Sequence, residues 1–167
     1  MAEEIVNKVA QAKIEQIDLA SFLHREEILE IDLKDQLWNE LVLKEKEFRA
    51  WVKEHDWTTY EDKVTCIYCS NEAIIPAWAF MLVTAQLTQA KQIICGHPDE
   101  AREDMFFENL NSWNVDHLKG QRVMVKGCSN IPNPNKAYVV LTEKLLPVVK
   151  SLMFGEPCSA VPVYKKK

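Results

Sequence analysis

The amino-acid sequence predicts an α/β protein, with a small parallel sheet in two or three layers and a helical N-terminal arm. Three short apolar runs each lead through a loop into a segment of helical periodicity. This βαβαβα order is typical of parallel sheets joined by right-handed crossovers. The length of 167 residues and the hydrophobic content of 47% suit one compact core with an arm packed on it.

The arm comprises residues 1–62, which carry 16 acidic and 8 basic side chains. Apolar residues within 28–33 predict a short strand or an extended segment. An amphipathic helix is predicted over 35–55, beginning with an aspartate N-cap. We expect its two tryptophans, Trp38 and Trp51, to anchor the helix on the core.

The core domain, residues 63–167, contains three pairs of a strand and a helix. In order, they are strand 64–69 with helix 74–90, strand 92–95 with helix 99–112, and strand 121–126 with helix 135–154. Proline supports these helix starts, because Pro98 and Pro134 each fit a first turn and Pro76 excludes an earlier start of the first helix. Pro147 is expected to kink or break the last helix.

Charge and composition exclude several classes of protein. The formal net charge is −5, so we expect no nucleic acid as a partner, and the lysines of 165–167 are expected to form a solvated tail. The longest uncharged stretch, 73–90, is too polar to span a bilayer, and the charged N-terminus does not resemble a signal peptide. We therefore expect a cytoplasmic protein with reduced thiols and no membrane contact. No G-x-G-x-x-G or Walker A sequence supports nucleotide binding.

Three of the five cysteines lie where predicted strands end. Parallel strands would place the thiols of Cys69, Cys95 and Cys128 along one edge of one sheet. Ligands of α/β proteins bind at this edge, where the N-termini of the following helices favour a thiolate. A thiolate is a soft ligand for zinc, copper(I) or iron–sulfur clusters, and it is also a good nucleophile. The sequence therefore predicts a thiol-based site at this edge.

Neighbouring polar residues suggest how such a site would work. Ser70 and Ser129 directly follow Cys69 and Cys128, and their hydroxyl groups are suited to donating hydrogen bonds to thiolate sulfur. His97 follows the second strand, where it is either the base of a Cys–His pair or a surface residue that caps a helix. These two roles of His97 predict different chemistry and stay open at this stage.

Two other cysteines are predicted to be packing residues. Free cysteine is among the most buried residue types, and we expect Cys66 and Cys95 to fill space within their strands. Cys66 and Cys69 form a C-x-x-C sequence, but residues three apart in a strand point to opposite faces. The pair is therefore not expected to hold one metal ion.

Cys158 lies beyond the last predicted helix, in the polar loop 155–159. A helix of about 20 residues would carry the chain about 30 Å from the carboxyl edge, farther than a short loop can span. Three alternatives stay open. The break at Pro147 turns the chain back, or Cys158 completes a site in a neighbouring subunit of a homo-oligomer, or Cys158 does not belong to the site.

Three segments carry a resemblance that covers almost the whole chain. They are Cys69-Ser-Asn-Glu-Ala-Ile-Ile-Pro76-Ala-Trp78, Lys126-Gly-Cys128-Ser129 and Gly155-Glu-Pro-Cys158-Ser159. Together they resemble a bacterial family known only as a domain of unknown function, whose cysteine motifs correspond to Cys69, Cys128 and Cys158. Such genes tend to lie beside iron–sulfur cluster assembly genes. The resemblance therefore implies a role near cluster biogenesis, with assembly proteins as partners.

Our main hypothesis is a site for zinc or an iron–sulfur cluster, held by three thiolates with one open position. The expected ligands are Cys69, Cys128 and Cys158, and their expected neighbours are Ser70, Ser129, Ser159 and His97. The first alternative is a metal-free cysteine enzyme, with Cys128 or Cys69 as nucleophile and His97 as base. The second alternative is a structural module without chemistry, which binds a partner through its acidic N-terminal face.

Overall fold

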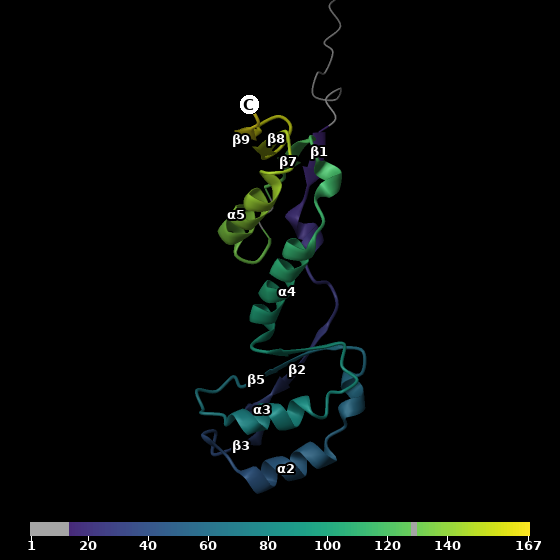
Figure 1. Cartoon of the computed structure of the whole chain (residues 1–167). Coiled ribbons are helices and arrows are strands. Elements are labelled where there is room, and N and C mark those ends of the chain that lie inside the picture. Colours follow the sequence, from purple (N-terminus) through teal and green to yellow (C-terminus); the bar gives the residue numbers. More distant parts are fainter. Residues whose placement is uncertain (1–13, 128–129) are drawn as a thin grey trace, which may run out of the picture. The chain divides into compact units, whose positions relative to one another are not determined.

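The computed structural model describes residues 14–127 and 130–167 and confirms the predicted α/β class (Figure 1). The chain divides into two compact units. Unit 1 comprises Met1–Leu23 and Met105–Lys167, and unit 2 comprises His24–Asp104. The boundary that the sequence suggested at residue 62 therefore falls inside unit 2.

Unit 2 is built on a three-stranded parallel sheet with the order β2-β5-β6. Its strands are β2 (Ile28–Asp32), β5 (Val64–Tyr68) and β6 (Gln92–Cys95). β5 and β6 were predicted as strands, because each is a short apolar run, and β2 was predicted as a short strand or an extended segment. β5 lies in the centre and is buried on both faces through Ile67, as expected of the middle strand of a parallel sheet.

Two helices pack on one face of this sheet and complete the core of unit 2. They are α2 (Glu45–Glu54) and α3 (Ala77–Thr84), and Figure 1 shows them side by side, with α3 next to β5. Phe48 and Val52 of α2 and Val83 of α3 are buried against Ile31 and Ile67 of the sheet. A 3-10 helix, Trp57–Tyr60, follows α2.

The prediction of one helix over 35–55 is wrong in its first half. A 3-10 helix, Leu33–Gln36, and a hairpin of β3 (Leu37–Trp38) and β4 (Val42–Leu43) precede α2. Asn39 and Glu40 form the hairpin turn with positive φ angles of 49° and 60°, which a helix does not accommodate. Trp38 is 51% exposed, so it does not anchor a helix on the core.

Unit 1 contains a four-stranded sheet with the order β1-β7-β8-β9. Its strands are β1 (Ile14–Ile17), β7 (Arg122–Val125), β8 (Ser151–Phe154) and β9 (Val161–Lys165). The first three are parallel, and β9 returns antiparallel to β8. Only β7 was predicted as a strand of this sheet.

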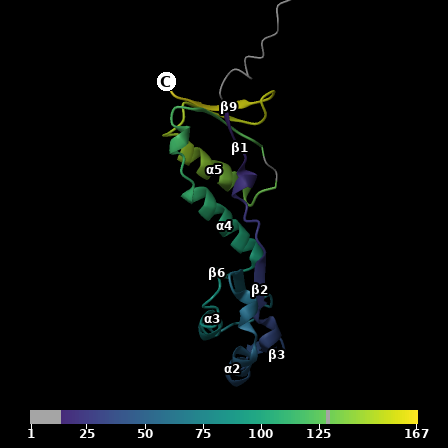
Figure 2. The same ribbon diagram turned by 90° about the vertical axis from the view of Figure 1, so that its right-hand side faces the viewer.

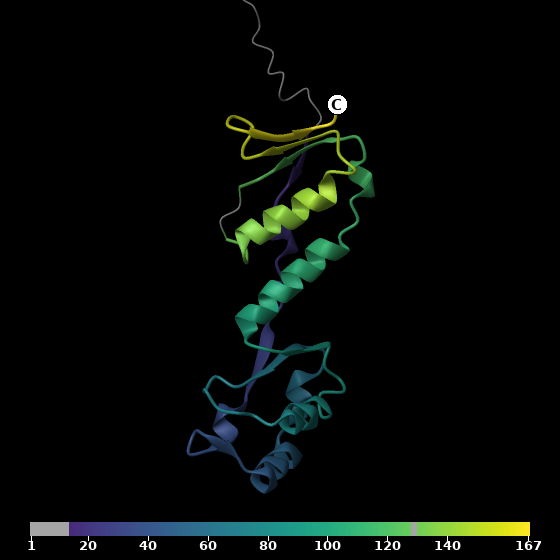
Figure 3. The ribbon, with the colours of Figure 1, turned by 60° about the vertical axis from the view of Figure 1, so that its left-hand side comes forward.

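Helix α5 (Pro134–Leu145) connects β7 to β8 and covers one face of the unit 1 sheet (Figures 2 and 3). Its buried residues Ala137, Leu141 and Leu145 belong to the same core cluster as Val123 and Leu152 of the sheet. The remaining helices are α4 (Pro98–Ser112), whose residues through Asp104 belong to unit 2, and 3-10 helices at Leu19–Phe22 and Asp116–Leu118.

Two further expectations are corrected by the pairing of the strands. The sequence predicted one sheet, but β7 pairs with β1 and β8, while β5 and β6 pair with each other in unit 2. The residues before 62 do not form a mainly helical arm, because β1 and β2 are strands of the two sheets. The last predicted helix also ends early, at Leu145, and the apolar segment after Pro147 forms β8.

Candidate functional site

A cavity of about 670 Å³ lies at the carboxyl edge of the β2-β5-β6 sheet. Its polar lining comes from the ends of β5 and β6 and from the segments that follow them. These residues are Tyr68, Cys69, Ser70, Asn71, Cys95, His97 and Glu100. Ile75 and Phe80 add apolar surface. This volume is within the range of small-molecule sites, and the edge is where parallel sheets place them.

Two thiols line this cavity, one from each of two neighbouring strands. Cys95 pairs with Ile67 across β6 and β5, and the N–H of Gly96 donates to the Ile67 carbonyl at 3.1 Å. The two strands therefore stay hydrogen-bonded up to the point where the loop after each strand begins. Cys95 is exposed and Cys69 is half-buried, so the prediction that Cys95 is a packing residue is wrong.

Cys66, by contrast, is the packing residue that the sequence predicted. Its side chain is fully buried in β5. Burial and the nearby Glu30 carboxylate raise the pKa of the Cys66 thiol, while Arg102 opposes this effect. Cys66 therefore stays a neutral thiol, and the C-x-x-C sequence does not act as a ligand pair.

His97 directly precedes α4, its side chain is 53% exposed, and it caps the first turn of this helix, which is one of the two roles expected from the sequence. Its Nδ1 accepts a hydrogen bond from the backbone N–H of Asp99 at 3.3 Å, and its own N–H donates to Glu100 Oε2 at 3.1 Å. The ring of Tyr68 packs edge-on against the imidazole, with 5.2 Å between centroids. With Nδ1 as an acceptor, a neutral imidazole carries its proton on Nε2 and presents a donor.

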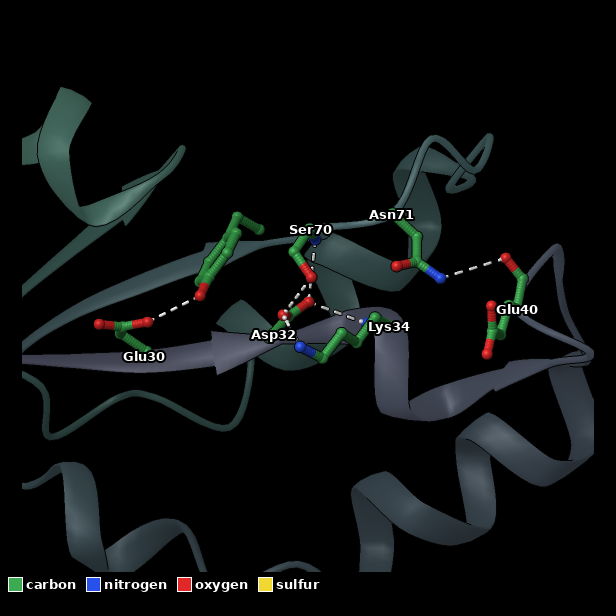
Figure 4. Close-up of polar contacts among 7 residues, drawn as sticks. Glu30, Asp32, Lys34, Glu40, Ser70 and Asn71 are labelled. Carbon is green, nitrogen blue, oxygen red and sulfur yellow. Dashed lines mark hydrogen bonds and ion pairs between the residues drawn. The ribbon is translucent and has the colours of Figure 1, made fainter.

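The loop that follows Cys69 is fixed by a carboxylate on the neighbouring strand. Figure 4 shows Asp32, at the end of β2, below Ser70. The Ser70 N–H donates to Asp32 Oδ1 at 3.0 Å, and the Ser70 hydroxyl donates to Oδ2 at 2.6 Å. The backbone N–H of Lys34 also donates to Oδ1 at 3.0 Å, and the Lys34 ammonium forms an ion pair with Oδ2 at 3.4 Å. The Ser70 hydroxyl thus donates its hydrogen bond to Asp32. The prediction that it donates to the Cys69 sulfur is wrong.

Electrostatics around Asp32 and Glu30 follow from these contacts. Partial burial raises the pKa of Asp32, but hydrogen bonds from Ser70 and Lys34 outweigh this and leave the pKa below its usual value. Beside it, the Tyr68 hydroxyl donates to Glu30 Oε2 at 2.7 Å, and this bond together with burial raises the pKa of Tyr68 to about 12. This rim of the site therefore combines an ionised carboxylate with a neutral phenol.

The same loop is tied to the hairpin of unit 2. The side-chain amide of Asn71 donates to the carbonyl of Glu40 at 3.4 Å (Figure 4). Neither Asp32 nor Asn71 was singled out from the sequence. Asp32 ends an apolar run, as Cys69 and Cys95 do, and a polar residue in this position is expected at the carboxyl edge of a parallel sheet. The sequence therefore contained a signal for Asp32.

Cys158 lies in unit 1, in the loop between β8 and β9, and is exposed. β8 runs parallel to β7, and the N–H of Gly155 donates to the carbonyl of Val125 at 2.9 Å. A Cβ atom on Gly127 would lie 3.5 Å from the Phe154 ring. The chain thus turns back after Pro147, the first of the three alternatives, and the Cys158 loop leaves the sheet at the edge where β7 ends.

The structure places the predicted ligands in different parts of the chain. Cys69 belongs to unit 2 and Cys158 to unit 1, while Cys128 and Ser129 lie outside the described residues. Ser159 donates its N–H to the Glu156 carbonyl at 2.9 Å within the loop of Cys158. Over residues 14–127 and 130–167, no three His, Cys, Asp or Glu side chains are grouped as ligands of a metal ion.

The fold and the cavity define an α/β protein with thiols at the carboxyl edge of a parallel sheet. Residues 3–166 match the family described as protein of unknown function (DUF2480), and the chain belongs to this family. The resemblance found in the sequence is thereby confirmed. The chain matches no curated protein and no solved structure. Within the described part, each helix is too short or too polar to cross a membrane.

Proposed function

We propose that this protein is thiol-dependent and that Cys69 is its reactive group, assisted by His97. One observation carries this proposal: Cys69 and His97, which follow neighbouring parallel strands, line the same cavity. A half-buried cysteine is reachable by a small molecule, and the cavity offers apolar surface at Phe80 and polar surface at Ser70 and Asn71.

His97 assists the thiolate as a hydrogen-bond donor. Since Nδ1 accepts from the Asp99 N–H, Nε2 is the ring nitrogen left to act as a hydrogen-bond donor. A donor of this kind stabilises a thiolate, and the thiolate is the form that attacks electrophilic carbon or sulfur. The exposed Cys95 supplies a second thiol in the same wall.

Labelling with iodoacetamide, followed by mass spectrometry of each cysteine, tests this proposal. Cys69 is expected to react faster than Cys158, although Cys158 is the more exposed thiol. His97→Ala should slow Cys69 by about tenfold or more, because it removes the hydrogen-bond donor that favours the thiolate, and should leave Cys158 unchanged. Equal rates in the wild type, with no effect of His97→Ala, would refute the proposal.

A second candidate is the metal or cluster site of the main hypothesis, with the protein as an accessory factor of cluster assembly. The return of β8 supports it, because the Cys158 loop leaves the sheet at the edge where β7 ends, and Cys128 follows β7 by three residues in the sequence. The expected ligands remain Cys69, Cys128 and Cys158, and zinc or an iron–sulfur cluster would be the group bound. The resemblance described from the sequence implies these three positions as the family's cysteine motifs.

Metal and acid-labile sulfide analysis of protein purified without oxygen and without chelator tests this second candidate. Iron and sulfide in near-stoichiometric amounts, lost in Cys69→Ser, Cys128→Ser and Cys158→Ser alike, would support a cluster, and zinc without sulfide would support a zinc site. Colourless protein without metal, combined with His97-dependent labelling of Cys69, would reject the metal site and leave the thiol proposal standing.

A further inference from the structure

A cationic cavity lies at the edge of the unit 1 sheet where β1, β7 and β8 begin and β9 ends. The sheet register aligns Ile14, Arg122, Ser151 and Lys165 in one row across β1, β7, β8 and β9. Because side chains alternate along a strand and Val123 faces the core under α5, this row belongs to the opposite face. A cavity of about 390 Å³ lies there, and Arg122, Lys150 and Lys165 line it.

A second cavity of about 400 Å³ adjoins the first. It is lined by Lys119, Lys166, Lys167 and the turn before β8, and it shares Lys150 with its neighbour. Backbone hydrogen bonds fix this shared residue, since the Lys150 N–H donates to Gln121 at 2.8 Å and the Lys150 carbonyl accepts from Lys166 at 2.9 Å. The two cavities together are called the lysine groove, with the cations Lys119, Arg122, Lys150, Lys165, Lys166 and Lys167.

The cations of the lysine groove have no acidic partners in the described part of the chain. All six are exposed, and none forms an ion pair with a described carboxylate. Unit 2 carries 17 acidic and 9 basic residues, whereas unit 1 carries 8 acidic and 11 basic residues. Six like charges in adjoining cavities repel one another and attract an anionic ligand. The expectation that 165–167 form a solvated tail is corrected for the backbone, because Lys165 belongs to β9 and the Lys166 N–H bonds to Lys150.

We propose that the lysine groove binds an extended acidic segment of a partner protein. Five of the six cations are lysines, and each ammonium group is a compact point charge that can attract a separate carboxylate. Carboxylates at alternate positions of an extended chain lie about 7 Å apart on one side, a spacing that distributes them over two adjoining cavities. Ile14, Met153 and Pro162 line the first cavity and accept an apolar side chain of the segment.

Fluorescence anisotropy with a short labelled peptide of glutamate and leucine tests this inference on the full chain. The peptide is expected to bind saturably and to weaken as salt is added, because the attraction is electrostatic. Lys150→Glu should weaken binding at least about tenfold, since Lys150 lines both cavities, and Lys165→Glu should weaken it as well. Lys53→Glu, the same charge change at an exposed position of α2, should leave binding unchanged.

The outcomes that overturn the inference are equally definite. One is the absence of saturable peptide binding by wild-type protein whose circular dichroism shows it to be folded. Another is an equal loss of peptide affinity in Lys53→Glu and Lys150→Glu. That result would mean that the peptide responds to the net charge of the protein and not to the lysine groove. A third is inorganic pyrophosphate or single-stranded DNA binding more tightly than the peptide, which would assign the groove to a phosphate ligand.

Discussion

Replacing Asp32 tests whether this carboxylate fixes the loop that carries Cys69. Its side chain is only 14% exposed and accepts three hydrogen bonds, two from Ser70 and one from the backbone of Lys34. A hydrogen bond to a charged group contributes about 1.5–3 kcal/mol, but the contributions of bonds that share one carboxylate are not additive. We therefore expect Asp32→Ala to lower the free energy of unfolding by about 2–3 kcal/mol.

Asp32→Asn is the matched variant, because it keeps the oxygen that accepts both backbone N–H groups. Those bonds to Oδ1 measure 3.0 Å from Ser70 and 3.0 Å from Lys34, and only the charge and the acceptor at Oδ2 are lost. The expected loss is about 1 kcal/mol. Urea unfolding followed by tryptophan fluorescence measures both values, and a double-mutant cycle with Ser70→Ala isolates the contact between the two side chains.

The pH dependence of these variants has a definite sign. The folded-state pKa of Asp32 lies below its usual value, so the ionised carboxylate stabilises the fold above the unfolded pKa. This contribution is lost as the pH falls through the folded pKa. The difference between wild type and Asp32→Asn should therefore shrink in acid. Equal stability of wild type and Asp32→Ala at neutral pH, or a difference that grows in acid, would refute the reasoning.

Two further predictions concern Tyr68 and the glycines near β8. Glu30→Gln should lower the spectroscopic titration midpoint of Tyr68 from about 12, because it removes the carboxylate that accepts the phenol proton, and an unchanged midpoint would contradict that assignment. Gly155→Ala should destabilise the protein by about 1–3 kcal/mol, because φ is +115° and the new Cβ would meet the Ser159 carbonyl oxygen at 3.2 Å. Gly127→Ala is the control, since its Cβ would only contact the Phe154 ring at 3.5 Å. Urea unfolding of both variants measures the loss of stability, and equal losses would contradict the strain argument.

The sequence predicted individual strands and helices of the fold, but it did not predict which strands pair with each other. β5, β6 and β7 were predicted because each apolar run is short and bounded by polar residues or glycine, and α4 because Pro98 marks its first turn. Hydrophobic periodicity does not state which strand pairs with which. The pairing of β7 with β1 and β8, and not with β6, depends on contacts far apart in the sequence.

The segment after α5 shows a second limit of sequence patterns. Residues 145–154 are largely apolar, and a short apolar run fits a buried helix and a buried strand equally well. Tertiary context decides in favour of β8, because Leu152 pairs with Val123 and is buried in the core of unit 1. Pro147 was correctly identified as the point where the helix is interrupted.

The candidate site was predicted in part. Cys69 and His97 were placed at strand ends, and the structure brings both to one cavity. Cys95 was judged by the usual burial of free cysteine, but its position at the last residue of β6 exposes it. Asp32 was missed although it ends an apolar run, because its hydrogen bonds depend on β2 lying beside β5, and periodicity does not encode which strands pair.

The most direct test of the central claim asks whether Cys69 and His97 act in one site. In a Cys95→Ser background, histidine ring resonances are recorded by NMR before and after alkylation of Cys69, with His97→Gln used for assignment. The account predicts that alkylation shifts the His97 resonances and leaves those of His55 unchanged, because the His55 ring packs on Trp51, Trp57 and Tyr60 of the same unit and does not line the cavity. His97 resonances that do not move, or that move no more than those of His55, would contradict a shared thiol site.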